Sequence, residues 1–203
     1  MKIKASRRFI WTAVIGFCFW ILGFYLFHFQ LHSEIEQGKV SEFESAFHEK
    51  TEELNDALIK FAHNYTTKKS KDEKFQLALD MEKETGFSFF SFNADTMDLW
   101  STSRIELPNP SDSYWEQHVI VLLENGWYKV ATHREEERLF ACTFLVKNEY
   151  NYENEDLVNE FSSELAPNLK GSISFGDKGF AVRNPEGEKL FSIVPTEEVE
   201  KNE

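Results

Sequence analysis

The chain has 203 residues, of which 41% are hydrophobic, and its formal net charge is −13. The first eight residues contain four basic side chains and no acid, so the rest carries −17, and such a surface would repel nucleic acid. The two cysteines, Cys18 and Cys142, lie in separate apolar stretches; we predict no disulfide, which favours a bacterial cell envelope over an exported eukaryotic domain.

Residues 9–29 contain no Asp, Glu, Lys or Arg, and most of them are large apolar residues. A bilayer core needs about 20 apolar residues in a helix, so this stretch predicts a transmembrane signal anchor that contacts the lipid bilayer. A cleaved signal peptide is the alternative, but its apolar core would be shorter and would end at a small-residue cleavage site, which residues 27–32 lack. Four basic residues precede the stretch and two acids follow it, which is the charge asymmetry that the positive-inside rule uses: Lys2, Lys4, Arg7 and Arg8, then Glu34 and Glu36.

These flanks predict a basic cytoplasmic segment at residues 1–8 and a single-pass protein of the bacterial inner membrane, with its N-terminus inside and its domain in the periplasm. Residues 30–65 follow as a juxtamembrane helix that continues the span to about His63, because apolar residues recur at helical spacing. Two chains would pair along this stripe as a homodimer, or the stripe would pack on the chain's own domain. Its residues are Val40, Phe43, Phe47, Leu54, Leu58 and Phe61.

Residues 66–195 are predicted to form one extracytoplasmic domain, followed by a charged tail at 196–203. After a polar break, Ser70 or Asp72 is expected to cap a second helix that ends at Gly86. From there the apolar spacing changes to that of strands, separated by turn residues. The expected strands lie at 87–92 and 99–102, at 127–133 and 139–147 as the clearest pair, at 172–175, and at 180–183 with 189–194; residues 114–123 are strand or short helix.

A further short helix is expected at 155–165, ended by Pro167. Two early helices followed mainly by hairpins indicate an α+β fold with an antiparallel sheet. We expect all strands between residues 86 and 194 to belong to one sheet.

Catalytic motifs such as a nucleophile elbow, a phosphate-binding glycine loop or a zinc-binding His-Glu-x-x-His are missing from the sequence, so we expect no enzyme and no cofactor. His28, His32 and Glu36 on one helix face fit an interfacial flank better than a metal site. The acids Glu149, Glu153, Glu155 and Asp156 fit a solvated surface better than a calcium loop. Aromatic residues are the candidates for a ligand pocket: Trp100, Trp115, Trp127 and Tyr128.

Four short stretches carry a resemblance to a known family: 125–128, 145–150, 154–161 and 184–191, which begin with Asn125-Gly126-Trp127-Tyr128 and end with Lys189-Leu190-Phe191. They resemble the N-terminal sensor regions of membrane-bound bacterial histidine kinases of the Bacteroidetes type, and the last hairpin is similar to that of PAS-like or Cache sensor domains. The resemblance implies a long N-terminal helix, an antiparallel sheet and a sensing role. The kinase transmitter of that family does not occur in these 203 residues.

The sequence therefore predicts a membrane-anchored signal-input region of a two-component system that responds to an unidentified small molecule or protein. The alternative is an anchored envelope protein with a structural or partner-binding role and no signalling output.

Overall fold

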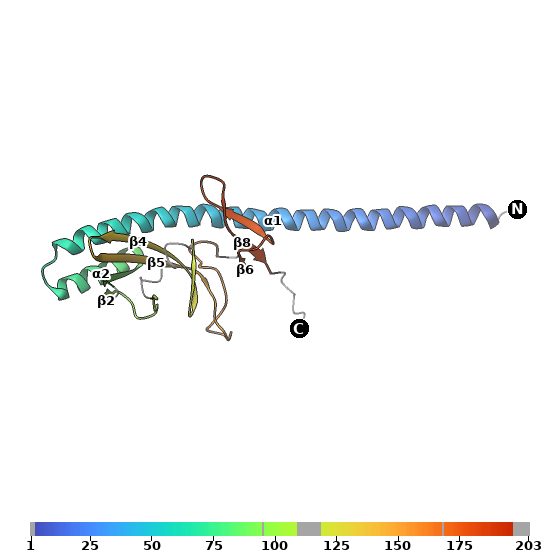
Figure 1. The fold of residues 1–203 in the computed structure, drawn as a ribbon. Coiled ribbons are helices and arrows are strands. Elements are labelled where there is room, and N and C mark those ends of the chain that lie inside the picture. The colour runs from blue at the N-terminus through green and yellow to red at the C-terminus, as the bar shows by residue number, and fades with distance from the viewer. Residues whose placement is uncertain (1–2, 95, 109–118, 168, 197–203) are drawn as a thin grey trace.

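The computed structural model describes residues 3–94, 96–108, 119–167 and 169–196, and within the first helix it describes the side chains of residues 15–27, 30 and 34 onward. Helix α1 (Ile3–Thr67) is continuous. Figure 1 shows it as a rod whose second half lies along the folded part of the molecule, while its first half projects away. Residues 9–29 and 30–65 therefore lie in one unbroken helix, as predicted, and this helix ends four residues beyond His63. No helix among the described side chains is long and apolar enough to cross a membrane.

Helix α2 (Lys71–Thr85) begins and ends where its capping residues predict. The Ser70 hydroxyl accepts a hydrogen bond from the Glu73 amide at 3.2 Å, and the Glu73 carboxylate accepts one from the Ser70 amide at 3.1 Å. This reciprocal pair satisfies two backbone donors at the helix start. At the other end Gly86 has a φ of 75°, a left-handed conformation that glycine adopts without a steric penalty.

The first sheet is antiparallel and has five strands in the order β2-β1-β5-β4-β3. The predicted pair is confirmed, because the two longest strands, β4 and β5, are antiparallel neighbours in the middle of the sheet. The expected first hairpin also forms, although its second strand starts three residues earlier than predicted. The strands are β1 (Ser88–Asn93), β2 (Thr96–Trp100), β3 (Val121–Leu123), β4 (Gly126–Glu135) and β5 (Arg138–Asn148).

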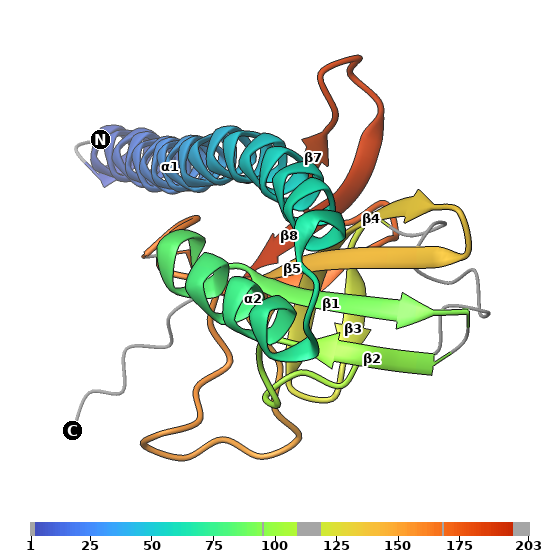
Figure 2. The same ribbon diagram turned by 90° about the vertical axis from the view of Figure 1, so that its left-hand side faces the viewer.

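Both faces of this sheet are covered. In β5 the side chains of Phe140, Cys142 and Phe144 point to the face that α1 and α2 cover, whereas Leu139 and Ala141 belong to a second core on the opposite face. The alternation follows from the two-residue period of a strand. Figure 2 shows both helices on the same face of the sheet. The opposite core is covered in part by the segment that carries Ile105 and Leu107.

The expectation of a single sheet is wrong, because three strands form a second antiparallel sheet in the order β6-β8-β7. The strands are β6 (Gly171–Ser174), β7 (Phe180–Arg183) and β8 (Lys189–Pro195), so each predicted strand exists. The long connection after β5 carries the chain away from the first sheet, and β8 then pairs with its own neighbours on both sides. In Figure 1 this second sheet lies along α1 nearer to the projecting half of the helix.

The helix predicted at 155–165 is also wrong. Phe161 forms an isolated antiparallel bridge with Lys147 at the edge of β5, and the Asn154 side chain accepts hydrogen bonds from the amides of Asp156 and Leu157 at 2.8 Å each. The Asn154 amide also donates to the Leu157 carbonyl at 3.1 Å, so a local turn uses a carbonyl that a helix would pair with the amide of Phe161. Burial of Phe161 and Leu165 in the main core then holds the segment against the sheet, and a turn follows at residues 163–165.

The apolar stripe of α1 packs on the chain's own sheets. Each of its six residues is buried in the main core. Phe47 lies between the two sheets, with its ring centroid 6.1 Å from that of Phe144 in β5 and 5.7 Å from that of Phe191 in β8. The surface of Val40, Phe43 and Phe47, where a second chain was expected to pair, is therefore covered within one chain. The same core contains residues on both sides of the expected division between the juxtamembrane helix (30–65) and the domain (66–195).

Candidate functional site

The four predicted aromatic residues do not converge. Trp100, at the end of β2, is 44% exposed, and its ring lies 5.7 Å from that of Phe75 in α2. Trp127 lies in β4 with its ring 5.7 Å from that of Phe175. Trp115 lies outside the described residues. None of the described three lines either of the two clefts discussed below, and their role in ligand binding stays a prediction.

Tyr128 follows Trp127 in β4 but belongs to the core on the opposite face of the sheet. It is almost fully buried, and its hydroxyl donates a hydrogen bond to the Asn125 side chain at 3.0 Å. Burial raises the pKa of the Tyr128 hydroxyl above its usual value, because desolvation disfavours the phenolate. The tyrosine is therefore a neutral side chain that fixes the turn before β4.

Polar side chains of α1 hold the second sheet by its edge. The backbone amide of Arg183 in β7 donates to the Glu44 carboxylate at 2.6 Å, and the Arg183 carbonyl accepts from the His48 ring at 2.6 Å. Glu44 and His48 are one helical turn apart, so both backbone groups of one edge residue are bonded to the same face of α1. Movement of the second sheet along α1 would break both bonds.

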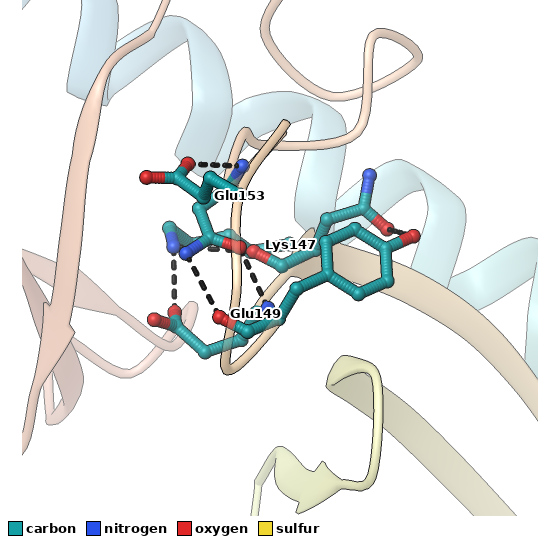
Figure 3. Close-up of polar contacts among 6 residues, drawn as sticks. Lys147, Glu149 and Glu153 are labelled. Atoms are coloured by element: carbon teal, nitrogen blue, oxygen red, sulfur yellow. Dashed lines mark hydrogen bonds and ion pairs between the residues drawn. The ribbon is translucent and has the colours of Figure 1, made fainter. Parts of the chain in front are cut away.

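A buried lysine links the loop after β5 to the sheet (Figure 3). Only 3% of the Lys147 side chain is exposed, and its ammonium donates to the Glu149 carboxylate at 2.6 Å and to the Asn148 carbonyl at 3.2 Å. The ammonium also lies 5.9 Å from the centre of the Phe161 ring. A buried charge is tolerated only when it is paired and hydrogen-bonded, and these contacts meet that requirement.

Two acids of the same loop, Glu149 and Glu153, hold the loop together, whereas Glu155 and Asp156 are exposed. Glu149 pairs with Lys147, and the Glu153 carboxylate accepts a hydrogen bond from the Asn159 amide at 2.8 Å (Figure 3). The Asn159 side chain in turn accepts from the Tyr150 amide at 2.6 Å. Within the described ranges no group of three or more His, Cys, Asp or Glu side chains is arranged to hold a metal ion. These contacts fix the course of the loop.

A pair of adjoining clefts lies at the end of the molecule farthest from the projecting half of α1. The larger has a volume of about 630 Å³ and the smaller about 260 Å³, and both are lined by Tyr65, Lys74 and Arg138. These residues come from the end of α1, the start of α2 and the start of β5. The larger cleft is completed by Thr66, Glu135, Glu136 and Phe140, and the smaller by Lys71, Asp98 and Leu99.

Tyr65 is the centre of this site. Its ring is almost fully buried, with the Lys74 ammonium 4.3 Å and the Arg138 guanidinium carbon 5.0 Å from the ring centre. A cation over an aromatic face is attracted by the ring quadrupole, so the ring gathers two positive charges in one place. Arg138 is also bound to both oxygens of Asp98, at 2.9 and 2.7 Å, and to the Ser91 hydroxyl at 2.7 Å.

Sequence reasoning missed this site because its members are far apart along the chain. Tyr65 is the last residue of the expected juxtamembrane helix, and the polar break that follows it indicated only a loop. Four lysines between residues 68 and 74 of a chain with a net charge of −13 were the available indication. Comparison with protein-family models, curated proteins and solved structures finds no match for this chain.

Proposed function

We propose that the chain is the membrane-anchored, extracytoplasmic signal-input region of a two-component signal transduction protein. The observation that carries the proposal is that one unbroken helix is both the apolar rod at the N-terminus and the central element of the folded core. Its second half contacts β4, β5, β7 and α2. A structural change anywhere in the two sheets would therefore displace the helix that leads to the membrane.

The exposure of the rod supports the membrane anchor. Between residues 15 and 27, ten large apolar side chains on all sides of α1 are 48–70% exposed. A helix that is apolar all round requires an apolar environment, and in the described contacts the folded domain does not cover it. The hydrocarbon core of a bilayer supplies that environment, and the basic residues before Phe9 orient the domain toward the periplasm.

The packing of α1 supports its use as a transmitter. Core side chains connect the helix to both sheets, and Glu44 and His48 bind the backbone of β7 directly. Packed interfaces of this kind tend to have discrete arrangements, which convert small changes at an input site into shifts of whole elements. The agreement with the long helix and antiparallel sheet implied by the sensor-kinase resemblance adds to this support.

A homodimer also remains a proposal, but its contact surface moves away from the juxtamembrane helix at 30–65. Because the stripe from Val40 to Phe61 is covered, a partner would meet the exposed face of α1, which carries acids at 42, 49, 52, 53 and 56. Facing acids repel one another. The pairing region that we propose is therefore the apolar part before residue 30, where this repulsion is absent.

The topology is tested by fusing alkaline phosphatase, which is active only in the periplasm, after Glu203 of the full chain. We expect an active fusion in the membrane fraction, and a matched β-galactosidase fusion should be inactive. Deletion of residues 9–29 should make the phosphatase fusion inactive and the β-galactosidase fusion active, which also shows that both fusions are expressed. An inactive phosphatase fusion, or a mature chain that begins near residue 30, would contradict the anchor and with it this function.

A further inference from the structure

We propose that the smaller cleft, between the end of α1, the start of α2 and strands β2 and β5, binds a small anion that carries one carboxylate or phosphate group. The cleft is lined by three cations, Lys71, Lys74 and Arg138, and one acid, Asp98. In a chain with a net charge of −13, a concave surface with two more cations than acids attracts an anion against the field of the rest of the molecule.

The two lysines are available to a ligand. Neither forms an ion pair within the described part of the chain. Lys74 lies 4.3 Å above the Tyr65 ring, and Lys71 lies 5.7 Å from the centre of the Phe75 ring. An ammonium has three N–H donors, and no hydrogen bond of the described side chains uses those of Lys71 or Lys74, so donors remain for a ligand. An anion between the two ammoniums would receive charge-assisted hydrogen bonds, which are stronger than neutral ones.

Arg138 is positioned in advance for the same ligand. Its three described hydrogen bonds, to Asp98 and Ser91, all use Nη1. A guanidinium has five N–H donors, so those on Nε and Nη2 remain for an anion. Asp98 and the Tyr65 ring hold the group in place, and a donor that is already fixed loses little conformational entropy on binding.

The neighbouring acids limit the size and charge of the ligand. Glu135 and Glu136 line the larger cleft, which shares Tyr65, Lys74 and Arg138 with the smaller one. A ligand that extended into the larger cleft with a second negative group would face these carboxylates and be repelled. The smaller cleft, of about 260 Å³, therefore fits a compact anion with a single charged group.

Binding would tie the end of α1 to α2 and β5, because the three cations come from α2 and β5 and surround a tyrosine of α1. The use of this contact as a signal rests on the proposed function, whereas the binding does not. Binding is measured on the purified chain, so its failure leaves the topology experiment unaffected, and failure of that experiment leaves the binding result unaffected.

The test is the thermal midpoint of the full chain in non-ionic detergent, titrated separately with sodium phosphate and sodium acetate while sodium chloride keeps the ionic strength constant. A ligand that binds the folded state raises the midpoint with concentration, which gives a dissociation constant. We expect at least one of the two anions to raise it, and the responsive anion identifies the group recognised. For that anion, the double variant Lys71→Gln, Lys74→Gln should bind roughly tenfold or more weakly, because it loses two charge-assisted contacts.

Lys83→Gln is the matched control, because Lys83 is an exposed lysine of the same helix that lines neither cleft. It should bind as tightly as the wild type. The inference is overturned if phosphate, acetate and chloride give the same midpoints, if the double variant binds as the wild type does, or if Lys83→Gln weakens binding equally. The midpoint without added anion shows that each variant is folded.

Discussion

Replacing Phe47 by alanine tests directly whether α1 packs on both sheets. The Phe47 side chain is 1% exposed, and its ring contacts those of Phe43, Phe144 and Phe191, so it packs on both sheets at once. Replacing a buried phenylalanine by alanine costs about 3–5 kcal/mol. That is a large share of the roughly 5–15 kcal/mol that holds a typical protein folded.

For a chain of this size each kcal/mol lowers the thermal midpoint by about 2–4 °C, so Phe47→Ala should lower it by about 6–20 °C. Thermal unfolding of the full chain in detergent, followed by near-UV circular dichroism, measures this. Ile59→Ala is the control, since Ile59 lies on the same helix but is 57% exposed; it should shift the midpoint by less than about 2 °C. A midpoint for Phe47→Ala as high as that of Ile59→Ala would refute the packing of the stripe on its own sheets.

Two further outcomes are expected from buried residues of β5. Val146→Asp would place a charge in a fully buried position and should lower the free energy of unfolding by about 3 kcal/mol or more. Its control is Leu122→Asp, at a position of β3 that is 45% exposed, which should lower it by less than about 1 kcal/mol. Equal thermal midpoints for the two variants would contradict the assignment of β5. Burial raises the pKa of the Cys142 thiol well above its usual value, so in a Cys18→Ser background a water-soluble maleimide at pH 8 should label the unfolded chain and spare the folded one. Because the folded chain keeps a proton that the unfolded chain releases, the free energy of unfolding should also fall as the pH rises past about 8.5. Equal labelling rates for the folded and denatured chains would show that Cys142 is not buried.

The sequence predicts best those elements whose ends are set by neighbouring residues. Helix α2 is an example, because Ser70 and Glu73 cap its start and Gly86 ends it, all within one short segment. The pairing of β4 with β5 is predictable for a similar reason, since both segments are rich in strand-forming residues and are joined by a tight turn at Glu136 and Glu137.

The sequence fails where distant residues decide the structure. The apolar spacing at 155–165 resembles a helix, but the bridge between Phe161 and Lys147 and the turn at Asn154 determine an irregular segment. In the same way, strand patterns near residues 172 and 190 indicate strands but not their sheet. The partner of β8 depends on where α1 and the loop after β5 carry the chain, and no local pattern encodes that.

The residues of the candidate site are still harder to predict from the sequence, because they come from distant parts of the chain. Aromatic composition led to Trp100, Trp127 and Tyr128, which the structure distributes over separate regions. The cleft instead arises where Tyr65 and Arg138 meet, and their contact depends on the register with which α1 crosses the sheet. A basic run predicts positive charge at a loop, but only the fold shows which cations share an aromatic ring.

Because α1 has no break, a tilt of the proposed membrane anchor would move the folded domain together with it. The described helix has no hinge between Ile3 and Thr67, and about 50 Å of it separates residue 30 from Tyr65 at helical rise. Helices that span bilayers tilt to match membrane thickness. A change in tilt of about 5° would swing the cleft sideways by about 4 Å. Bilayer thickness would then set the position of the cleft above the membrane surface, and a load on the domain would in turn tilt the anchor.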